Sequence, residues 1–113
     1  MAGGVEATEG PEDTARRELQ EELTLKHAVP VFRLDSVSSI PAYHFDRSSW
    51  ALDMYVVPEF AFAADLTGQQ VRLSDEHSAL RWLPYEDAHE LLTWDSNRTA
   101  LWELDQRLRR GDI

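Results

Sequence analysis

Three glutamates in the segment 16–23 have the spacing that could hold a metal ion. Glu18, Glu21 and Glu22 stand at positions i, i+3 and i+4, and a helix brings such positions onto one face. Carboxylates on one face repel each other, and a divalent cation such as Mg²⁺ or Mn²⁺, which prefers hard oxygen ligands, relieves that repulsion. The same pattern is also typical of a solvated amphipathic helix, in which Arg17 pairs with Glu21 one turn away.

The glutamates can share a face only on a helix, and the surrounding sequence predicts one from Pro11 to Leu23. Proline suits the first helical position, and the acidic residues that follow it suit the positive end of the helix dipole. Ala15, Leu19 and Leu23 recur every four residues and form an apolar stripe. This stripe lies beside the glutamate face, so burying it would fix the orientation of the carboxylates.

The rest of the chain reads as strands followed by helices. Two segments rich in aromatic and β-branched residues, 29–40 and 50–65, predict strands. The order of elements indicates an α/β (α+β) domain with its strands between helices. The later elements expected are a turn at Thr67–Gln70, a strand–loop–strand over 71–84, a short helix over 84–92 and a final helix over 95–110.

Composition bounds the function further. The chain has 113 residues, which fits one domain, and its hydrophobic content of 42% with four tryptophans favours a folded core. The net charge of -10 argues against nucleic acid polymers and anionic membranes as partners. The absence of cysteine excludes thiol chemistry. With no long apolar run and no leader pattern, a cytoplasmic location is the default expectation.

The residues before the glutamates complete a longer pattern. Gly3 is followed after five residues by Glu9, and after seven more by the run Arg17 to Leu25, which reads RELQEELTL. This closely resembles the Nudix box, G-x5-E-x7-R-E-U-x-E-E-x-G-U, in which U is aliphatic. Eight of the nine specified positions agree, and the exception is the late glycine, which is Thr24 here.

The resemblance implies an α/β/α layered domain with a mixed sheet. It also implies hydrolysis of a nucleoside diphosphate linked to another group, with Mg²⁺ or Mn²⁺ as the cofactor and a metal-activated water as the attacking group. The carbonyl of Gly3 would join the metal site, and Glu9 and Arg17 would form a salt bridge that braces the loop against the helix. The catalytic, metal-binding carboxylates implied by position are Glu18, Glu21 and Glu22.

The later part of the chain resembles one Nudix branch, the dihydroneopterin triphosphate or dATP pyrophosphohydrolases. That branch has an E-H-x-x-x-x-W-L segment followed by W-x-S-N-R, matched here from Glu76 to Leu83 and from Trp94 to Arg98. It also tends to carry threonine at the position of Thr24. The resemblance implies that Glu76 completes the metal site or acts as general base, although it could equally be an ordinary loop acid.

A nucleotide-like or pterin polyphosphate substrate needs cationic and aromatic contacts as well. Arg98 is favoured because it lies in the branch-like SNR sequence, while Trp82 is expected in the core. Tyr43, Phe45, Trp50 and Tyr55 could stack on a ring, with core packing the expected role for most of them. The cationic candidates for substrate binding are Arg33, Arg81 and Arg98, with Arg47 and Arg72 as further possibilities.

The family fold normally has several tens of residues before the box, and those residues form its first strands. Here the box begins at Gly3, so residues 1–113 are expected to form a single Nudix domain that is incomplete at its N-terminus. A homodimer could complete the sheet by covering its exposed edges. Two alternatives stay open: a catalytically inactive, truncated Nudix-like domain that binds a nucleotide or a protein partner, and an acidic interaction module. Metal-dependent turnover would separate the active Nudix hydrolase from both alternatives.

Overall fold

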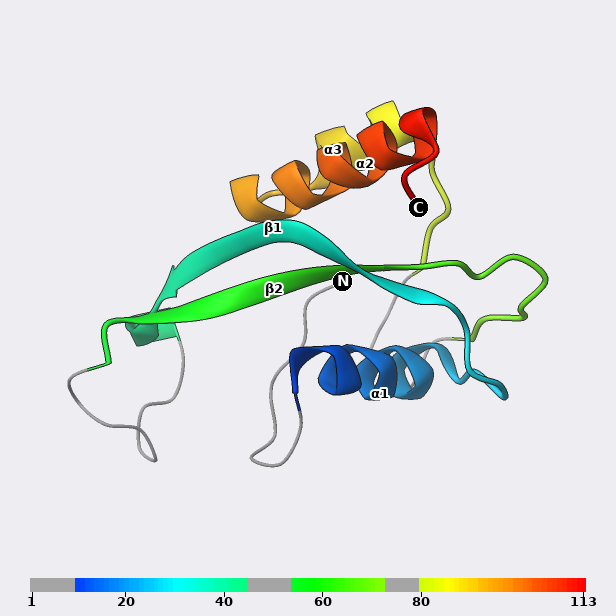
Figure 1. Cartoon of the computed structure of the whole chain (residues 1–113), viewed down its shortest axis with the longest axis horizontal. Coiled ribbons are helices and arrows are strands. Elements are labelled where there is room, and N and C mark those ends of the chain that lie inside the picture. Colours follow the sequence, from blue (N-terminus) through cyan, green and yellow to red (C-terminus); the bar gives the residue numbers. More distant parts are fainter. Residues whose placement is uncertain (1–9, 45–53, 73–79) are drawn as a thin grey trace.

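A computed structural model describes residues 10–44, 54–72 and 80–113. A two-stranded antiparallel sheet lies between helices, with α1 on one face and α2 and α3 on the other (Figure 1). The expected α/β/α layering is confirmed, and the described residues contribute an antiparallel pair to the sheet rather than a mixed set of strands. The elements are α1 (Pro11–Leu23), β1 (Val31–Pro41), a 3₁₀ turn (Ala42–His44), β2 (Val56–Ala64), α2 (Tyr85–Leu91) and α3 (Asp95–Arg110).

Helix α1 has the bounds that the sequence predicts, and its apolar stripe is buried. The exposed fractions of Ala15 and Leu19 are 3% and 8%. Leu19 packs with Leu25 and Val29 in a small core cluster, against which Leu23, Val31, Leu66 and Val71 also pack. The glutamate-bearing helix is therefore fixed both to the start of β1 and to the turn that follows β2.

Thr24 ends α1 in the left-handed conformation, with φ 52° and ψ 47°. Glycine usually takes this position, because a β-branched residue at positive φ is strained. Here the Thr24 hydroxyl donates to the carbonyl oxygen of Arg72 at 2.9 Å, and the N–H of Arg72 donates to the carbonyl oxygen of Leu23 at 2.9 Å. The position of the late box glycine thus has the backbone shape that glycine favours, and a tertiary hydrogen bond holds threonine in it.

The expectation of strands within 71–84 is wrong in the described part of that segment. Residues 71–72 and 80–84 have no regular secondary structure. The N–H of Arg72 donates to the end of α1 instead of to a neighbouring strand, so this part of the chain joins the turn after β2 to α1. The turn predicted at Thr67–Gln70 does form, with the N–H of Gln69 donating to the carbonyl oxygen of Leu66 at 3.0 Å.

Strand β1 carries a bulge that ties it to α3. Arg33 pairs with Phe62 and Val37 pairs with Phe60, so the three residues 34–36 of β1 face Ala61 alone. The ladder therefore leaves N–H groups in the bulge without a strand partner. Glu103 of α3 accepts both of them: the N–H of Asp35 donates to its Oε2 at 2.6 Å, and that of Ser36 to its Oε1 at 2.8 Å.

The Glu103 carboxylate also accepts bonds from two side chains, the Ser36 hydroxyl at 2.6 Å and the Arg107 Nε at 2.8 Å. Burial raises the pKa of Glu103, but the bonds from the Ser36 hydroxyl, the Asp35 N–H, Arg107 and the Ser36 N–H lower it more. The resulting pKa is about 2. Arg107 reaches Asp35 as well, at 3.0 Å, so charged side chains fasten α3 onto the bulge.

Several aromatic residues expected in the core are exposed instead. The exposed fractions are 68% for Trp82, 77% for Tyr43 and 79% for Tyr55. Tyr43 and Tyr55 lie at the end of the β1–β2 hairpin, which extends beyond the helices that cover the rest of the sheet (Figure 1). In the described parts of the chain, no helix is long and apolar enough to cross a membrane.

Candidate functional site

The predicted carboxylates lie on α1 with unequal exposure. Glu18 and Glu22 are half-buried, whereas Glu21 is exposed. The Arg17 guanidinium lies between two of them, with Nη2 at 3.4 Å from Glu18 Oε1 and Nη1 at 3.2 Å from Glu21 Oε2. The predicted pair of Arg17 with Glu21 is confirmed, and Glu18 shares the same guanidinium. Arg17 therefore reduces the repulsion between two carboxylates of this face.

The donor chemistry of this face fits a hard divalent cation. Glu18 and Glu22 are one turn apart and half-buried, so their oxygens can act from one side of the helix. Within residues 10–44, 54–72 and 80–113, no three acidic or histidine side chains come together as a ready metal site. Gly3, Glu9 and Glu76, the other residues implied for the site, lie outside the described residues. The described face thus offers part of a ligand set.

The three arginines proposed as substrate contacts lie on separate elements. Arg33 is exposed on β1, with its guanidinium carbon 4.4 Å from the centre of the Phe60 ring in a cation–π contact. The Nε of Arg98 donates to the carbonyl oxygen of Leu92 at 2.9 Å, which joins the start of α3 to the end of α2. Arg81 is exposed in the segment before α2. Of the three, Arg98 is half-buried, and its hydrogen bond to the Leu92 carbonyl gives it a structural role.

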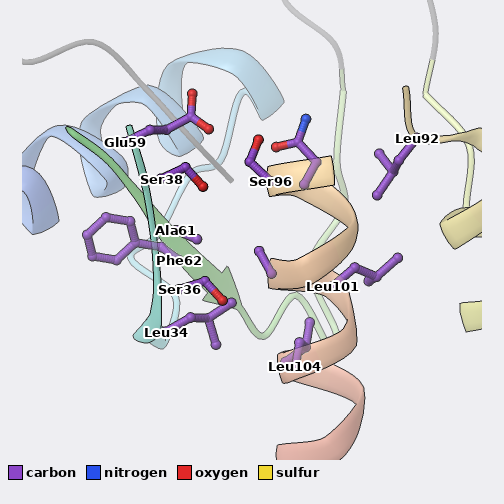
Figure 2. Close-up of a pocket in the computed structure, with 12 residues that line it drawn as sticks. Leu34, Ser36, Ser38, Glu59, Ala61, Phe62, Leu92, Ser96, Leu101 and Leu104 are labelled. Atoms are coloured by element: carbon purple, nitrogen blue, oxygen red, sulfur yellow. The ribbon is translucent and has the colours of Figure 1, made fainter. Parts of the chain in front are cut away.

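A cavity of about 430 Å³ lies between the sheet and α3. In Figure 2, Ser38 and Glu59 come from the two strands and face Ser96, at the start of α3, across this space. A neighbouring hollow of about 320 Å³ shares Glu59 and Ser96 and extends the space to Trp94. Apolar side chains make up much of the remaining lining, among them Leu34, Ala61, Leu92, Leu101 and Leu104.

The lining suits the uncharged part of a small molecule. Its volume lies in the range typical of ligand pockets, which combine apolar walls with a few convergent polar groups. Glu59 offers a carboxylate acceptor, and Asn97 offers both a donor and an acceptor. None of the described lining residues is a lysine or an arginine, so the phosphate part of a ligand would find no counter-charge in this cavity.

Sequence reasoning missed most of this cavity. Ser96 and Asn97 belong to the W-x-S-N-R segment, of which only Arg98 was predicted to contact the substrate. Glu59 and Ser38 gave no comparable signal, because a polar residue in a strand is usually on the solvated face. Their pairing across the ladder, with Ser38 opposite Glu59, becomes visible only once the register is known.

The fold and the helix with its glutamates match a known family. The NUDIX domain profile matches residues 1–102. A crystal structure of a candidate NUDIX hydrolase from Listeria monocytogenes str. 4b F2365 superimposes with a TM-score of 0.87 at 50% sequence identity, covering 97% of this chain and 74% of that chain. Among curated proteins, none is significantly similar to this chain.

The chain therefore belongs to the NUDIX family. The assignment supports a hydrolase, and the family suggests nucleoside diphosphate derivatives as its substrates.

Proposed function

We propose that the chain is a divalent-metal-dependent pyrophosphohydrolase that cleaves a small nucleotide-like or pterin polyphosphate. The observation that carries the proposal is the half-buried position of Glu18 and Glu22 on one helix, at the box spacing, in a chain of this family. A merely solvated helix face would leave its carboxylates exposed, as Glu21 is.

In this proposal Glu18, Glu21 and Glu22 hold Mg²⁺ or Mn²⁺, with the Gly3 carbonyl and Glu76 as further ligands. A divalent ion held there supplies positive charge for the diphosphate and makes a water more acidic. Glu76 is the residue proposed as general base. Arg17 acts as a positioning residue, since its guanidinium already holds Glu18 and Glu21 in place.

The cavity beside α3 would take the ring system of the substrate, and because α1 lies on the other face of the sheet (Figure 1), the phosphates would pass a sheet edge to reach the α1 carboxylates. Its leucine side chains provide an apolar surface for a flat ring, and Glu59 and Asn97 can bond polar atoms at the ring edge. Trp94, which is 62% exposed, lies at the neighbouring hollow, where it can cover a ring. Arg33, Arg81 and Arg98 remain the proposed contacts for the phosphates.

The sheet that holds this cavity has two strands in the described residues. A homodimer that pairs sheet edges would complete it, and we include that assembly in the proposal. Residues 1–113 are taken as one domain.

The test is phosphate or pyrophosphate release from a panel of nucleoside triphosphates, pterin triphosphates and dinucleotides, with Mg²⁺ and with chelator. Glu22→Gln removes one ligand charge at nearly constant size, and we expect the metal-dependent rate to fall by about 100-fold or more. Glu90→Gln is the matched control, because Glu90 is an exposed carboxylate on α2.

Release that persists in chelator, or equal rates in the two variants, would contradict the metal assignment. Saturable nucleotide binding by a folded protein that releases no phosphate would instead favour the catalytically inactive binding domain.

A further inference from the structure

A second cleft, of about 680 Å³, lies where the end of α1 meets the turn after β2. Lys26 and His27 line it from the segment after α1, and Arg72 lines it from the segment after the turn. Figure 1 shows these two segments side by side at the end of α1. The side-chain amides of Gln69 and Gln70 add further hydrogen-bond donors to the lining.

The cleft brings together two of the 11 Lys and Arg side chains of a chain that has 21 Asp and Glu residues. Neither the Lys26 ammonium nor the Arg72 guanidinium contacts a carboxylate in the described parts of the chain, and no described lining residue is acidic. Among the described residues, four other arginines pair with carboxylates, whereas Arg33, Arg81, Arg98 and Arg110 have no such ion pair there. The pairs are Arg16 with Glu12, Arg17 with Glu18 and Glu21, Arg107 with Glu103 and Asp35, and Arg109 with Asp105.

The walls of the cleft are held in place before any ligand arrives. The two hydrogen bonds between the end of α1 and Arg72 join them, one through the Thr24 hydroxyl and one to the Leu23 carbonyl. Beneath them, Leu25 belongs to the core cluster against which Val71 packs. A ligand would therefore meet donors whose backbone is already ordered, which reduces the entropy lost on binding.

The dipole of α1 accounts for only part of this arrangement. Cations after the last turn of a helix stabilise its negative end, which suits Lys26. Arg72 comes from a different segment, and its backbone rather than its side chain makes the contact with α1. The helix end thus explains neither the Arg72 guanidinium nor the amide donors that share the cleft.

We propose that this cleft binds a phosphate-class oxyanion, with Lys26 and Arg72 supplying the charge and His27, Gln69 and Gln70 supplying further donors. Point charge from lysine and a planar fork of N–H groups from arginine are the usual means of holding phosphate. The anion could be free phosphate or pyrophosphate, or the polyphosphate tail of a nucleotide. The binding needs none of the α1 carboxylates, so it is independent of the proposed hydrolysis.

Lys26 is the only lysine in the chain, which gives a direct readout. Reductive methylation with ¹³C-formaldehyde keeps the positive charge and adds one side-chain NMR signal, besides that of the α-amine. Pyrophosphate is titrated in the presence of chelator at constant ionic strength, with sodium chloride as the reference anion. We expect a saturable shift of the Lys26 signal with pyrophosphate and none with chloride.

Arg72→Gln should weaken this binding by about 5-fold or more, since a charged hydrogen bond is lost. Arg110→Gln, which changes an exposed arginine at the end of α3, should leave the binding unchanged and serves as the matched control. Circular dichroism checks that both variants keep their helices.

Saturation by inorganic pyrophosphate assigns the cleft to free anions, and saturation only by a nucleoside triphosphate assigns it to a polyphosphate tail. The absence of a saturable shift with either ligand, or equal affinity in the two variants, overturns the proposal.

Discussion

Replacing Glu103 with alanine should destabilise the fold more than any other change to an acidic side chain of α3. The variant leaves two N–H groups of the β1 bulge, those of Asp35 and Ser36, without their carboxylate partner. It also removes the bonds from the Ser36 hydroxyl and from Arg107. Each hydrogen bond to a charged group contributes roughly 1 kcal/mol or more, and water replaces part of the loss, so we expect about 2 kcal/mol.

The pKa of Glu103 gives a second route to the same magnitude. Its pKa falls from an ordinary value of 4.5 to about 2 in the folded protein. One pKa unit corresponds to about 1.4 kcal/mol, so the linkage gives an upper bound of about 3 kcal/mol, which solvent screening near the surface reduces. Because the folded pKa is depressed, this stabilisation is fully present above the unfolded pKa. It is lost as the pH falls through the folded pKa.

The assay is urea unfolding of the parent chain, Glu103→Ala and Glu103→Gln between neutral pH and pH near the folded pKa, with Glu90→Gln as the control. The difference in free energy of unfolding between the parent and Glu103→Ala should be largest at neutral pH. It should shrink as the pH drops below the ordinary carboxyl pKa of 4.5. A difference below about 0.5 kcal/mol at neutral pH, or one independent of pH, would refute the reasoning.

Three further predictions concern other residues of the two sites. Thr24→Val keeps the strained φ but loses the bond to the Arg72 carbonyl, and should lower the free energy of unfolding in urea by about 1–2 kcal/mol. Thr24→Gly relieves the strain, and its free energy of unfolding should stay within about 1 kcal/mol of the parent. Equal losses in the two variants would contradict the strain argument. Ala61→Phe fills the cavity beside α3 and should weaken nucleotide binding about 10-fold by tryptophan fluorescence, whereas Ala64→Phe at the exposed end of β2 should not. Without substrate, Arg98→Ala should lower the free energy of unfolding by about 1 kcal/mol, because it removes the bond to the Leu92 carbonyl. An unchanged free energy of unfolding would contradict this structural role and leave substrate binding as the proposed role of Arg98.

The helices were largely predictable because their signals are local. Pro11, the acids after it and the leucine stripe define α1, and the final helix runs over 95–110 as the sequence predicts. The strands were predictable in existence but less so in extent: β2 begins at Val56, several residues into the expected segment 50–65. Strand ends depend on which residues find a partner across the ladder, which one strand's own sequence does not reveal.

The functional sites show the same contrast between features set by local spacing, which were predictable, and features set by tertiary contacts, which were not. The pair of Arg17 with Glu21 follows from helical spacing and was predicted, whereas the cation-lined cleft joins Lys26 to Arg72 through tertiary contacts that no spacing rule connects. Glu103 gave only one hint, its position four residues before Arg107 on the same helix. Its hydrogen bonds to the bulge depend on an irregularity of β1 that the pattern VFRLDSVSSI does not predict.

The bulge also sets how this strand can change in length. Residues 34–36 stand where a regular ladder would have a single residue opposite Ala61, so the surplus is an even number. Side chains alternate between the faces of a sheet, and an even surplus preserves that alternation beyond the bulge. Losing both extra residues would straighten β1 and leave Ser38 facing the cavity, whereas losing one would turn Ser38 and Ile40 to the opposite face. Among relatives of this chain, insertions and deletions at this point should therefore occur in pairs.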